Sequence, residues 1–459
     1  MLIKQNFFSK HNIKISPVQK IAIGFILVIL TGAFLLSLPI SSRAGVSTSL
    51  VNALFTASSA TCVTGLVVFD TYQYWSGFGQ MIILLLIQIG GLGFMTVATL
   101  FSFFINRNIS VTERIVMSKS FGLNDLSGVV RLAKHVLIGT FLIELIGAII
   151  LSTQFIGEFG VIGGIIKSIF HSISAFCNSG FDIIGQKAAY IGLTPYVSNA
   201  TICITIMGLV VIGGLGFFVW EDLYNYFRKK ITKLSTYTKL VLVITGILIF
   251  AGALLIFLFE FNNPGTMKNL SLKGKFLSSF FHSITPRTAG FNTLEIPNMT
   301  ENSKVLTMIL MFIGGSSGST AGGIKTVTVG LILIAVFQIA RGRRNIVISN
   351  RKISNDNLLR ALSIFMIGLL MVLVGSFVLN TIEPNLDYFV CLFECISAFG
   401  TVGLTFGITP ELNSLSKLVL ILLMYFGRVG ILTITFSIVL GMDKNKQKLS
   451  FPETNVMIG

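Results

Sequence analysis

Long apolar stretches separated by short polar ones dominate the hydropathy pattern of the 459-residue chain. Several are about 20 residues long, the length at which an α-helix crosses the hydrocarbon core of a bilayer. Examples are Ile21–Ile40, Phe78–Ile105, Val136–Ile156, Thr201–Trp220, Leu240–Phe261 and Leu415–Leu440. A transmembrane β-barrel would instead need shorter segments that alternate between apolar and polar residues. The pattern therefore predicts an all-α polytopic membrane protein.

A second pattern, shorter than a membrane span, occurs four times. The four stretches are ATCVTGL (60–66), AFCNSGF (175–181), TPRTAGF (285–291) and AFGTVGL (398–404). Each ends in a glycine and a large apolar residue, and the glycines lie 115, 110 and 113 residues apart. A short amphipathic run, too short to span a bilayer, precedes each glycine. These runs are Leu50–Ser59, Ile165–Ser174, Phe276–Ile284 and Tyr388–Ser397.

The surroundings of the four glycines also repeat. A long apolar segment precedes each short run and another follows the glycine, so each unit is a spanning helix, a re-entrant half-helix, a pore loop and a second spanning helix. Four tandem units predict eight transmembrane helices plus four re-entrant pore helices around a pseudo-fourfold axis. The predicted units are residues 1–115, 116–233, 234–345 and 346–459.

The basic residues are concentrated in alternate loops. Five segments hold 23 of the 34 lysines and arginines: Lys4–Lys20, Arg107–Lys134, Arg228–Lys239, Arg341–Arg360 and Lys444–Lys448. The positive-inside rule places these segments and both termini in the cytoplasm, with the first apolar stretch retained as a helix because no small-residue cleavage site follows it. The net charge of +16 is thus explained by the membrane topology and does not indicate nucleic-acid binding. A second use for this charge is docking of an acidic or regulatory partner.

The four loops have the chemistry of an ion filter. Non-helical backbone at membrane depth persists only where it is buried in protein or lines water. A ring of backbone carbonyls can replace the hydration shell of a monovalent cation, and glycine allows the backbone angles that such a ring needs. A carbonyl ring suits K⁺ better than Mg²⁺, which dehydrates reluctantly. The five cysteines lie in apolar segments and indicate neither a disulfide framework nor a zinc site.

On these loops the chain resembles the ion-translocating subunit of the Ktr/Trk/HKT superfamily of potassium transporters, and most of all the KtrB type. The resemblance covers essentially the whole chain and implies four channel-like repeats, a homodimer with one pore per subunit, and K⁺ bound only at filter carbonyls. Gly65 matches the K⁺-conducting pattern of the family. None of the four loops has the full five-residue signature of tetrameric K⁺ channels, which implies looser discrimination between K⁺ and Na⁺. The filter residues that the resemblance implies are Val63, Thr64, Gly65, Asn178, Ser179, Gly180, Thr288, Ala289, Gly290, Thr401, Val402 and Gly403.

A Gly/Ser-rich run interrupts the apolar segment after the third loop. Such residues do not form a stable helix, so we expect an intramembrane loop below the filter, which resembles the gate of the family. Ile324 separates Gly323 from Lys325 and a helix precedes the run, so it is not a phosphate-binding loop. We call residues 314–323 the gate loop: Gly314, Gly315, Ser316, Ser317, Gly318, Ser319, Thr320, Ala321, Gly322 and Gly323.

Charged residues also occur inside apolar segments. Arg428 falls near the middle of the last apolar stretch, and an arginine there must face a cavity or a partner. It resembles the pore-facing arginine of the family, and we expect it to be an electrostatic barrier and a donor to the gate loop, with Lys325 sharing that work. Glu144 and Glu394 are interpreted as structural carboxylates.

Three functional hypotheses remain open on the sequence. The first is a regulated K⁺ channel-like transporter in the cell membrane, with Na⁺ as activator or co-ion. The others are an Na⁺- or H⁺-coupled symporter and the K⁺-translocating subunit of an ATP-driven pump. No hydrolytic site is visible, so the chain is not predicted to be an enzyme and no tightly bound cofactor is expected. The resemblance implies a cytosolic ring of RCK-type (KtrA- or KtrC-like) subunits that binds ATP or ADP. The basic segments Arg228–Lys239 and Arg341–Arg360 are the predicted docking surface, and the second directly follows the helix that carries the gate loop.

Overall fold

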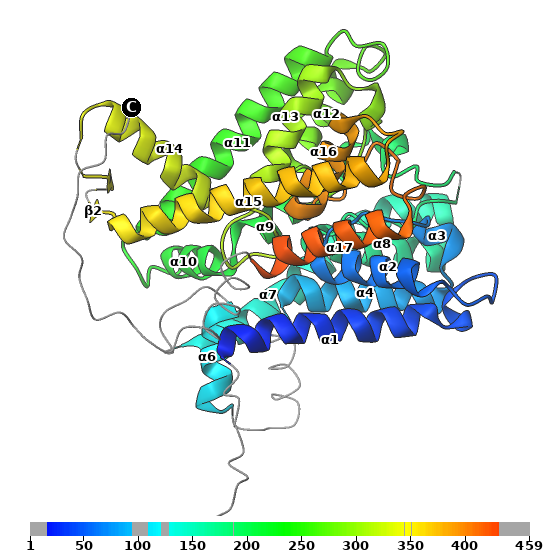
Figure 1. Cartoon of the computed structure of the whole chain (residues 1–459), viewed down its shortest axis with the longest axis horizontal. Helices are drawn as coiled ribbons and strands as arrows, with labels where there is room; N and C mark the ends of the chain where they lie inside the picture. The colour runs from blue at the N-terminus through cyan, green and yellow to red at the C-terminus, as the bar shows by residue number, and fades with distance from the viewer. Residues whose placement is uncertain are drawn as a thin grey trace, which may run out of the picture.

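The computed structural model describes residues 16–93, 109–120, 128–186, 188–343, 345–349 and 351–430. Some sequence expectations fall outside these ranges: the basic segment at 444–448, most of the one at 4–20, residue Arg344, and the distal parts of the apolar stretches that begin at Phe78 and Leu415. Helices make up almost all of the regular structure (Figure 1).

The helices follow the predicted order. The first unit holds α1 (Pro17–Ser37), η1 (Pro39–Ser41), α2 (Leu50–Cys62), α3 (Thr71–Tyr74) and α4 (Gly77–Leu92), and α6 (Val111–Ser120) crosses the predicted boundary between the first two units. The second holds α7 (Val129–Phe159), α8 (Val161–Phe176), η2 (Thr194–Tyr196), α9 (Ala200–Leu215) and α10 (Phe217–Phe227). The third holds α11 (Thr236–Glu260), α12 (Leu272–Ile284), η3 (Ile296–Asn298), α13 (Glu301–Phe312) and α14 (Thr326–Ala340). The last holds α15 (Asn355–Ile382), α16 (Tyr388–Gly400) and α17 (Ser414–Val429), after a hairpin of β1 (Val347–Ile348) and β2 (Arg351–Lys352).

The same helix packing occurs four times and closes on itself. A long helix packs on the short helix that follows it in α1–α2, α7–α8, α11–α12 and α15–α16. The helix after each loop then packs on the short helix of the next unit, in the pairs α4–α8, α9–α12, α13–α16 and α17–α2. The last pair returns to the first unit, so the short helices surround one central axis. This agrees with the pseudo-fourfold arrangement, while the exact unit boundaries stay a prediction.

Four described helices, α1, α7, α11 and α15, are long and apolar enough to cross a membrane. The predicted single helix over 201–220 is wrong: α9 and α10 meet at Gly216 with a bend of 97°, and count together as a fifth span only if the pair is one broken span. The reason is the backbone of Gly216, with φ of +96°, which cannot continue an α-helix. The expected total of eight spanning helices stays a prediction, because several second helices are broken or run into residues outside the described ranges.

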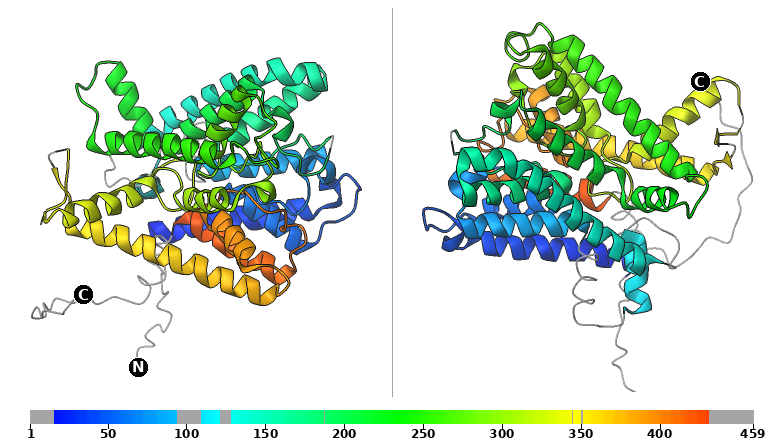
Figure 2. Two further views of the ribbon diagram at one scale, coloured as in Figure 1. Left: turned by 90° about the horizontal axis from the view of Figure 1, so that it is seen from above. Right: turned by 180° about the vertical axis from the view of Figure 1, so that it is seen from behind.

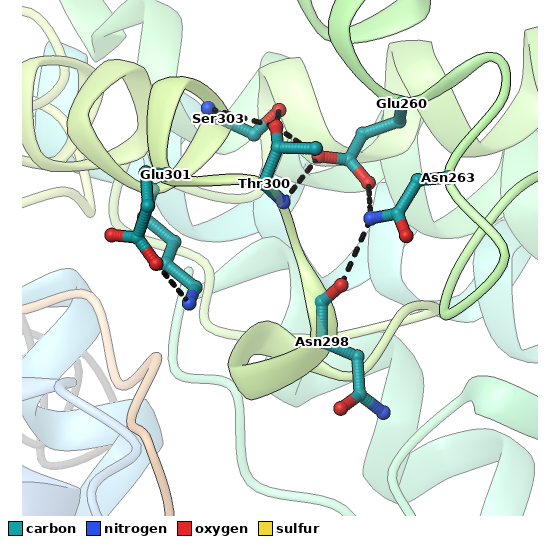
Figure 3. A network of polar contacts seen from close by, with 7 residues as sticks. Glu260, Asn263, Asn298, Thr300, Glu301 and Ser303 are labelled. Atoms are coloured by element: carbon teal, nitrogen blue, oxygen red, sulfur yellow. Dashed lines mark hydrogen bonds and ion pairs between the residues drawn. The ribbon is translucent and has the colours of Figure 1, made fainter.

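The two ends of the molecule differ. In Figures 1 and 2, α10, α14 and the β-hairpin lie towards one end of the helix bundle, and α3 lies at the opposite end. Near the latter end, Glu260 fastens the end of α11 to the start of α13 (Figure 3). Its buried carboxylate accepts hydrogen bonds from the Thr300 N–H at 2.9 Å, the Thr300 hydroxyl at 2.8 Å and the Asn263 amide at 2.7 Å. This network fixes the helix that leads into the gate loop.

Candidate functional site

The four filter loops begin where the short helices end. Helices α2 and α16 stop directly before a left-handed residue, Val63 (φ 58°) and Thr401 (φ 51°). Asn178 (φ 60°) and Thr288 (φ 71°) hold the same place in the other two loops, two residues before the glycine. All four short helices thus direct their C-terminal, negative dipole ends at the loops, as a cation site requires.

Left-handed backbone occurs at two positions in each filter loop, although the sequence argument predicted it only at the glycines. The glycines have φ of 89°, 72°, 75° and 94° in chain order. The additional left-handed residues carry side chains, and three of them, Val63, Thr288 and Thr401, are β-branched, for which such a backbone is strained. Strain of about 1–3 kcal/mol per residue is typical of functional sites where the surroundings enforce it.

The four glycines and four carbonyl oxygens form a closed ring. A β-carbon added at Gly65 would lie 2.3 Å from the oxygen of Ser179, and one at Gly180 would lie 2.6 Å from that of Ala289. The same relation links Gly290 to the oxygen of Val402 at 2.2 Å, and Gly403 to that of Thr64 at 2.3 Å. Each loop therefore abuts the next in the order one, two, three, four, one. A side chain at any of these glycines would displace a carbonyl of the neighbouring loop.

A cavity of about 450 Å³ opens above this ring, and all four filter glycines lie in its wall. Among the described residues no lysine or arginine lines it, whereas four carboxylates do, one from each unit: Asp70, Asp182, Glu295 and Glu411. Asp182 lies in the loop beyond the filter, outside the spanning helices, and burial raises the pKa of its carboxyl to about 6. A cavity lined by charges of one sign concentrates counter-ions, so this mouth favours cations.

The gate loop is buried or half-buried on the other side of the filter and is fastened to two other units of the chain, the second and the fourth. The N–H groups of Ser316 and Thr320 donate to the carbonyls of Gly214 (3.0 Å) and Gly213 (3.3 Å) in α9. The Gly323 N–H donates to the carbonyl of Gly427 in α17 at 3.2 Å.

The gate loop also accepts hydrogen bonds. The Phe217 N–H donates to the Gly318 carbonyl at 2.8 Å, and the Tyr237 hydroxyl donates to the Ser317 carbonyl at 3.0 Å. Its non-helical backbone is thus satisfied by protein rather than lipid, as backbone at this depth must be.

Arg428 and Lys325 cap the carbonyls of the gate loop. The Arg428 guanidinium donates to the carbonyl of Thr320 and, in the neighbouring first unit, to those of Gly90 and Gly91 at the end of α4. The Lys325 ammonium donates to the carbonyl of Ala321 at 2.8 Å. Arg428 does not lie in the middle of a helix as expected: α17 ends at Val429, so Arg428 is in its last turn, where a cation also complements the helix dipole.

One side chain joins the gate loop to the filter. The Thr320 hydroxyl lies 3.1 Å from the Asn178 amide oxygen and 3.1 Å from the carbonyl of Phe176. Asn178 in turn donates to the Thr288 hydroxyl at 3.4 Å. The inner rim of the filter is thus in direct contact with the gate.

Three features were not found in the sequence analysis. Gly90, Gly213 and Gly427 each pack against the carbonyl of the residue four positions before a filter glycine, with added β-carbons at 1.9, 2.0 and 1.9 Å from it. The recurrent pair GGLG at 90–93 and 213–216, with GRVG at 427–430, was the available signal. The second is Arg287, buried in the third filter loop with its side chain 3.4 Å from the Thr245 hydroxyl. The third is a set of four buried hydroxyl residues near the ends of the short helices: Ser59, Ser174, Thr285 and Ser397.

The two intramembrane glutamates differ. Glu144 is buried and accepts a hydrogen bond from the Gln88 amide at 3.1 Å, with the Cys177 thiol 3.9 Å away. This arrangement supports the structural interpretation. Glu394 accepts a hydrogen bond from the Thr409 hydroxyl, but its other carboxylate oxygen is buried without a partner among the described residues. The role of Glu394 therefore stays a prediction.

Comparison with known proteins gives consistent matches. The family model described as TrkH, cation transport protein, matches residues 9–448. The potassium/sodium uptake protein NtpJ of Enterococcus hirae is 42% identical, over 97% of this chain and 98% of that protein. The Ktr system potassium uptake protein B of Bacillus subtilis is 40% identical over 97% and 98%, and that of Vibrio alginolyticus 34% over 96% and 94%.

A solved structure has the same fold. The potassium transporter TrkH from Vibrio parahaemolyticus superimposes with a TM-score of 0.70, covering 96% of this chain and 87% of that one. The two sequences are 17% identical, so this match concerns the fold.

Proposed function

The chain belongs to the TrkH family of cation transport proteins, and on this premise we propose that it carries K⁺ into the cell through the ring of filter carbonyls. It is a multi-pass membrane protein, and the family is one of transporters rather than enzymes. The observation that carries the proposal is the closed relation between four glycines and four carbonyls at the floor of an acidic cavity. Such a ring replaces the hydration shell of a monovalent cation without adding net charge.

The gate loop is the proposed barrier to K⁺ flow. It lies across the path below the filter, and Arg428 and Lys325 place two positive charges there. A cation leaving the filter would meet both the loop and these charges. Opening requires that Arg428 release the carbonyl of Thr320, which a shift of α14 or α17 would accomplish.

The gate has a mechanical connection to the basic end of the molecule. Lys325 directly precedes α14, and near the other end of α14 the Gln338 side chain exchanges two hydrogen bonds with Val347 of β1 at 2.7 and 2.8 Å. Apolar residues of α14, the hairpin and the start of α15 form one small core. A partner that pulls on the hairpin would therefore move the helix that begins at the gate.

This connection supports a cytosolic partner, as do the names of relatives that place them in a Ktr system. We infer that a ring of RCK-type nucleotide-binding subunits docks at this end, that the transporter is a homodimer, and that both termini are cytoplasmic. The ring can open the gate only if it binds the open and closed positions of α14 unequally. ATP or ADP would then bind to the ring and not to this chain.

The first experiment is a flux assay with the purified chain in liposomes, with K⁺, Na⁺ and H⁺ gradients imposed separately. K⁺ entry down a K⁺ gradient alone is expected, and stimulation by Na⁺ without a gradient would identify Na⁺ as an activator. Entry that requires an Na⁺ or H⁺ gradient would replace this proposal with a coupled symporter. Absence of K⁺ entry under every gradient would overturn it.

The second experiment tests the docking surface by reversing the charges of Arg341, Arg343 and Arg344 together. Copurification with the soluble subunit and ATP-stimulated flux are both expected to be lost. Reversal of Lys268 and Lys273, exposed residues between α11 and α12 and at the start of α12, is the control and should change neither. If the arginine variant keeps both properties, the ring docks elsewhere.

A further inference from the structure

Four buried hydroxyl residues hold the filter loops from behind. Each lies at the end of a short helix, six residues before the filter glycine or, in the third loop, five: Ser59, Ser174, Thr285 and Ser397. The carbonyl of each accepts the N–H of the residue before the glycine, at 2.8–2.9 Å in all four loops. We call these residues the filter anchors.

The side chains of the anchors act in two different ways. In the first and fourth loops they accept: the N–H of Gly65 donates to the Ser59 hydroxyl, and that of Gly403 to the Ser397 hydroxyl, both at 3.1 Å. In the second and third loops the hydroxyls instead donate to the carbonyl of the residue that follows the glycine. The Ser174 hydroxyl donates to the carbonyl of Phe181 at 2.7 Å, and the Thr285 hydroxyl to that of Phe291 at 2.5 Å.

The accepting anchors aim a carbonyl at the pore. The N–H of Gly65 belongs to the same peptide unit as the carbonyl of Thr64, and in a trans peptide the two groups point in opposite directions. Since the N–H points back to the short helix, the carbonyl points forward into the ring. The same reasoning applies to the Val402 carbonyl, whose peptide N–H is held by Ser397. In the third loop the Thr285 carbonyl performs this task, accepting the Gly290 N–H at 3.3 Å.

The donating anchors remove a carbonyl from the pore. Because the carbonyls of Phe181 and Phe291 point back at hydroxyls behind the loop, they are turned away from the axis. The corresponding carbonyls of Leu66 and Leu404 have no hydrogen-bond donor within the described part of the chain. The backbone reflects the same division: the glycines of loops one and four have φ of 89° and 94°, and those of loops two and three 72° and 75°.

Resting on the proposed function, we propose that the filter anchors determine cation specificity in two modes. Ser59 and Ser397 keep the central carbonyl ring on the axis and thereby set the preference for K⁺ over Na⁺. Ser174 and Thr285 hold back two carbonyls of the layer above the ring and leave only those of Leu66 and Leu404, on one side, free to turn towards it. The outermost cation site is therefore asymmetric, and the donating anchors set its affinity for external K⁺.

The test compares hydroxyl-free variants of both kinds in liposomes. Ser59→Ala and Ser397→Ala should each lower the K⁺/Na⁺ flux ratio roughly three- to tenfold, the effect of losing one neutral hydrogen bond. Ser174→Ala and Thr285→Val should keep that ratio within about twofold and change the half-saturating external K⁺ concentration by roughly threefold. Ser59→Thr and Ser397→Thr retain a hydroxyl and should restore the ratio.

Matched controls are available on the same short helices. Ser58 and Ser278 are buried, and their hydroxyls have no partner among the described residues, so Ser58→Ala and Ser278→Ala should leave both measurements unchanged. If Ser59→Ala and Ser397→Ala behave like these controls, the anchors do not set specificity. If all four anchor variants lower the ratio alike, the division into two modes is wrong.

Equilibrium binding gives a readout that does not depend on transport. Titration calorimetry of the purified protein with K⁺ and with Na⁺ should show the same loss of preference in the Ser59 and Ser397 variants. Should the wild-type chain carry no K⁺ in liposomes, the proposed function fails, but the ratio of the two binding constants still decides for or against the anchors.

Discussion

The filter loops and the gate loop both keep irregular backbone inside the membrane, yet different contacts hold them. Each filter loop is fastened mainly to its own short helix, by hydrogen bonds that reach four to six residues back along the chain. The gate loop is fastened mainly to other units, through carbonyls such as those of Gly213 and Gly427 and the guanidinium of Arg428. A locally held loop keeps its shape when distant helices move, whereas a loop held by distant helices is released by them. The contrast matches a rigid selector beside a movable barrier.

The largest expected effect comes from removing the gate. Deletion of residues Ser316–Ala321 eliminates the carbonyl that binds Arg428 and several backbone hydrogen bonds at once. Since single hydrogen bonds to charged groups contribute roughly 1.5–3 kcal/mol, K⁺ flux without any partner should rise on the order of a hundredfold. The K⁺/Na⁺ ratio should stay the same because the filter is held separately. Flux at the wild-type level in a correctly folded variant would contradict the gate.

A side chain in the filter should have the opposite effect. In Gly290→Ser, the new β-carbon would meet the Val402 carbonyl at 2.2 Å, so K⁺ flux should fall about tenfold or more, with Na⁺ flux less affected. Gly45→Ser is the control, because Gly45 has a similar φ of +68° but open space around it. Unchanged K⁺ affinity and K⁺/Na⁺ ratio in Gly290→Ser would remove Gly290 from the filter.

Removing the guanidinium of Arg428 tests only the contact between the gate loop and a distant helix. Arg428→Ala should raise K⁺ flux about tenfold, because a charge-assisted hydrogen bond to the gate and a positive barrier both disappear. Arg428→Lys keeps the charge but cannot reach three carbonyls in the same way, so an intermediate flux is expected. If Arg428→Ala only lowers the amount of folded protein, Arg428 is a structural residue.

Thr320 belongs to the gate loop but also contacts the filter, so the distinction between the two regions is weakest at this residue. Thr320→Val keeps the shape and removes the hydroxyl that lies against Asn178 and Phe176. Flux should rise about threefold, as for one neutral hydrogen bond. A change in the K⁺/Na⁺ ratio larger than the change in flux would show that gate and filter act as one unit.

The smallest effect is expected at the outer mouth. Asp182, with its raised pKa of about 6, is charged above that pH and neutral below it, so K⁺ uptake at low external K⁺ should fall about twofold as the outside is acidified through pH 6. Asp70 and Lys167 act electrostatically on the same carboxylate. Asp182→Asn should remove this pH dependence, and a retained dependence would assign it to another group.

Much of the plan was readable from the sequence. Segment length and the recurring Gly-apolar stretches are local properties, so the Gly/Ser interruption could be located, and the ends of the short helices were predicted to within four residues. The left-handed backbone at Val63, Thr288 and Thr401 could not, because β-branched residues disfavour it, and asparagine, although it tolerates this backbone, does not by itself predict it at Asn178. It is imposed by the hydrogen bonds that fold each loop back onto its short helix.

The partners of the charged and hydroxyl groups were decided by tertiary structure alone. The sequence marked Arg428 as a residue in need of acceptors and as a donor to the gate loop, but two of its acceptors, Gly90 and Gly91, lie more than 300 residues away. They became available only because α4 ends there and the packing of α17 on α2 closes the ring. Likewise, the hydroxyls that lie five or six residues before the filter glycines accept hydrogen bonds in two loops and donate them in the other two. Composition and spacing fix which groups are present, whereas the direction of each peptide unit fixes what they bind.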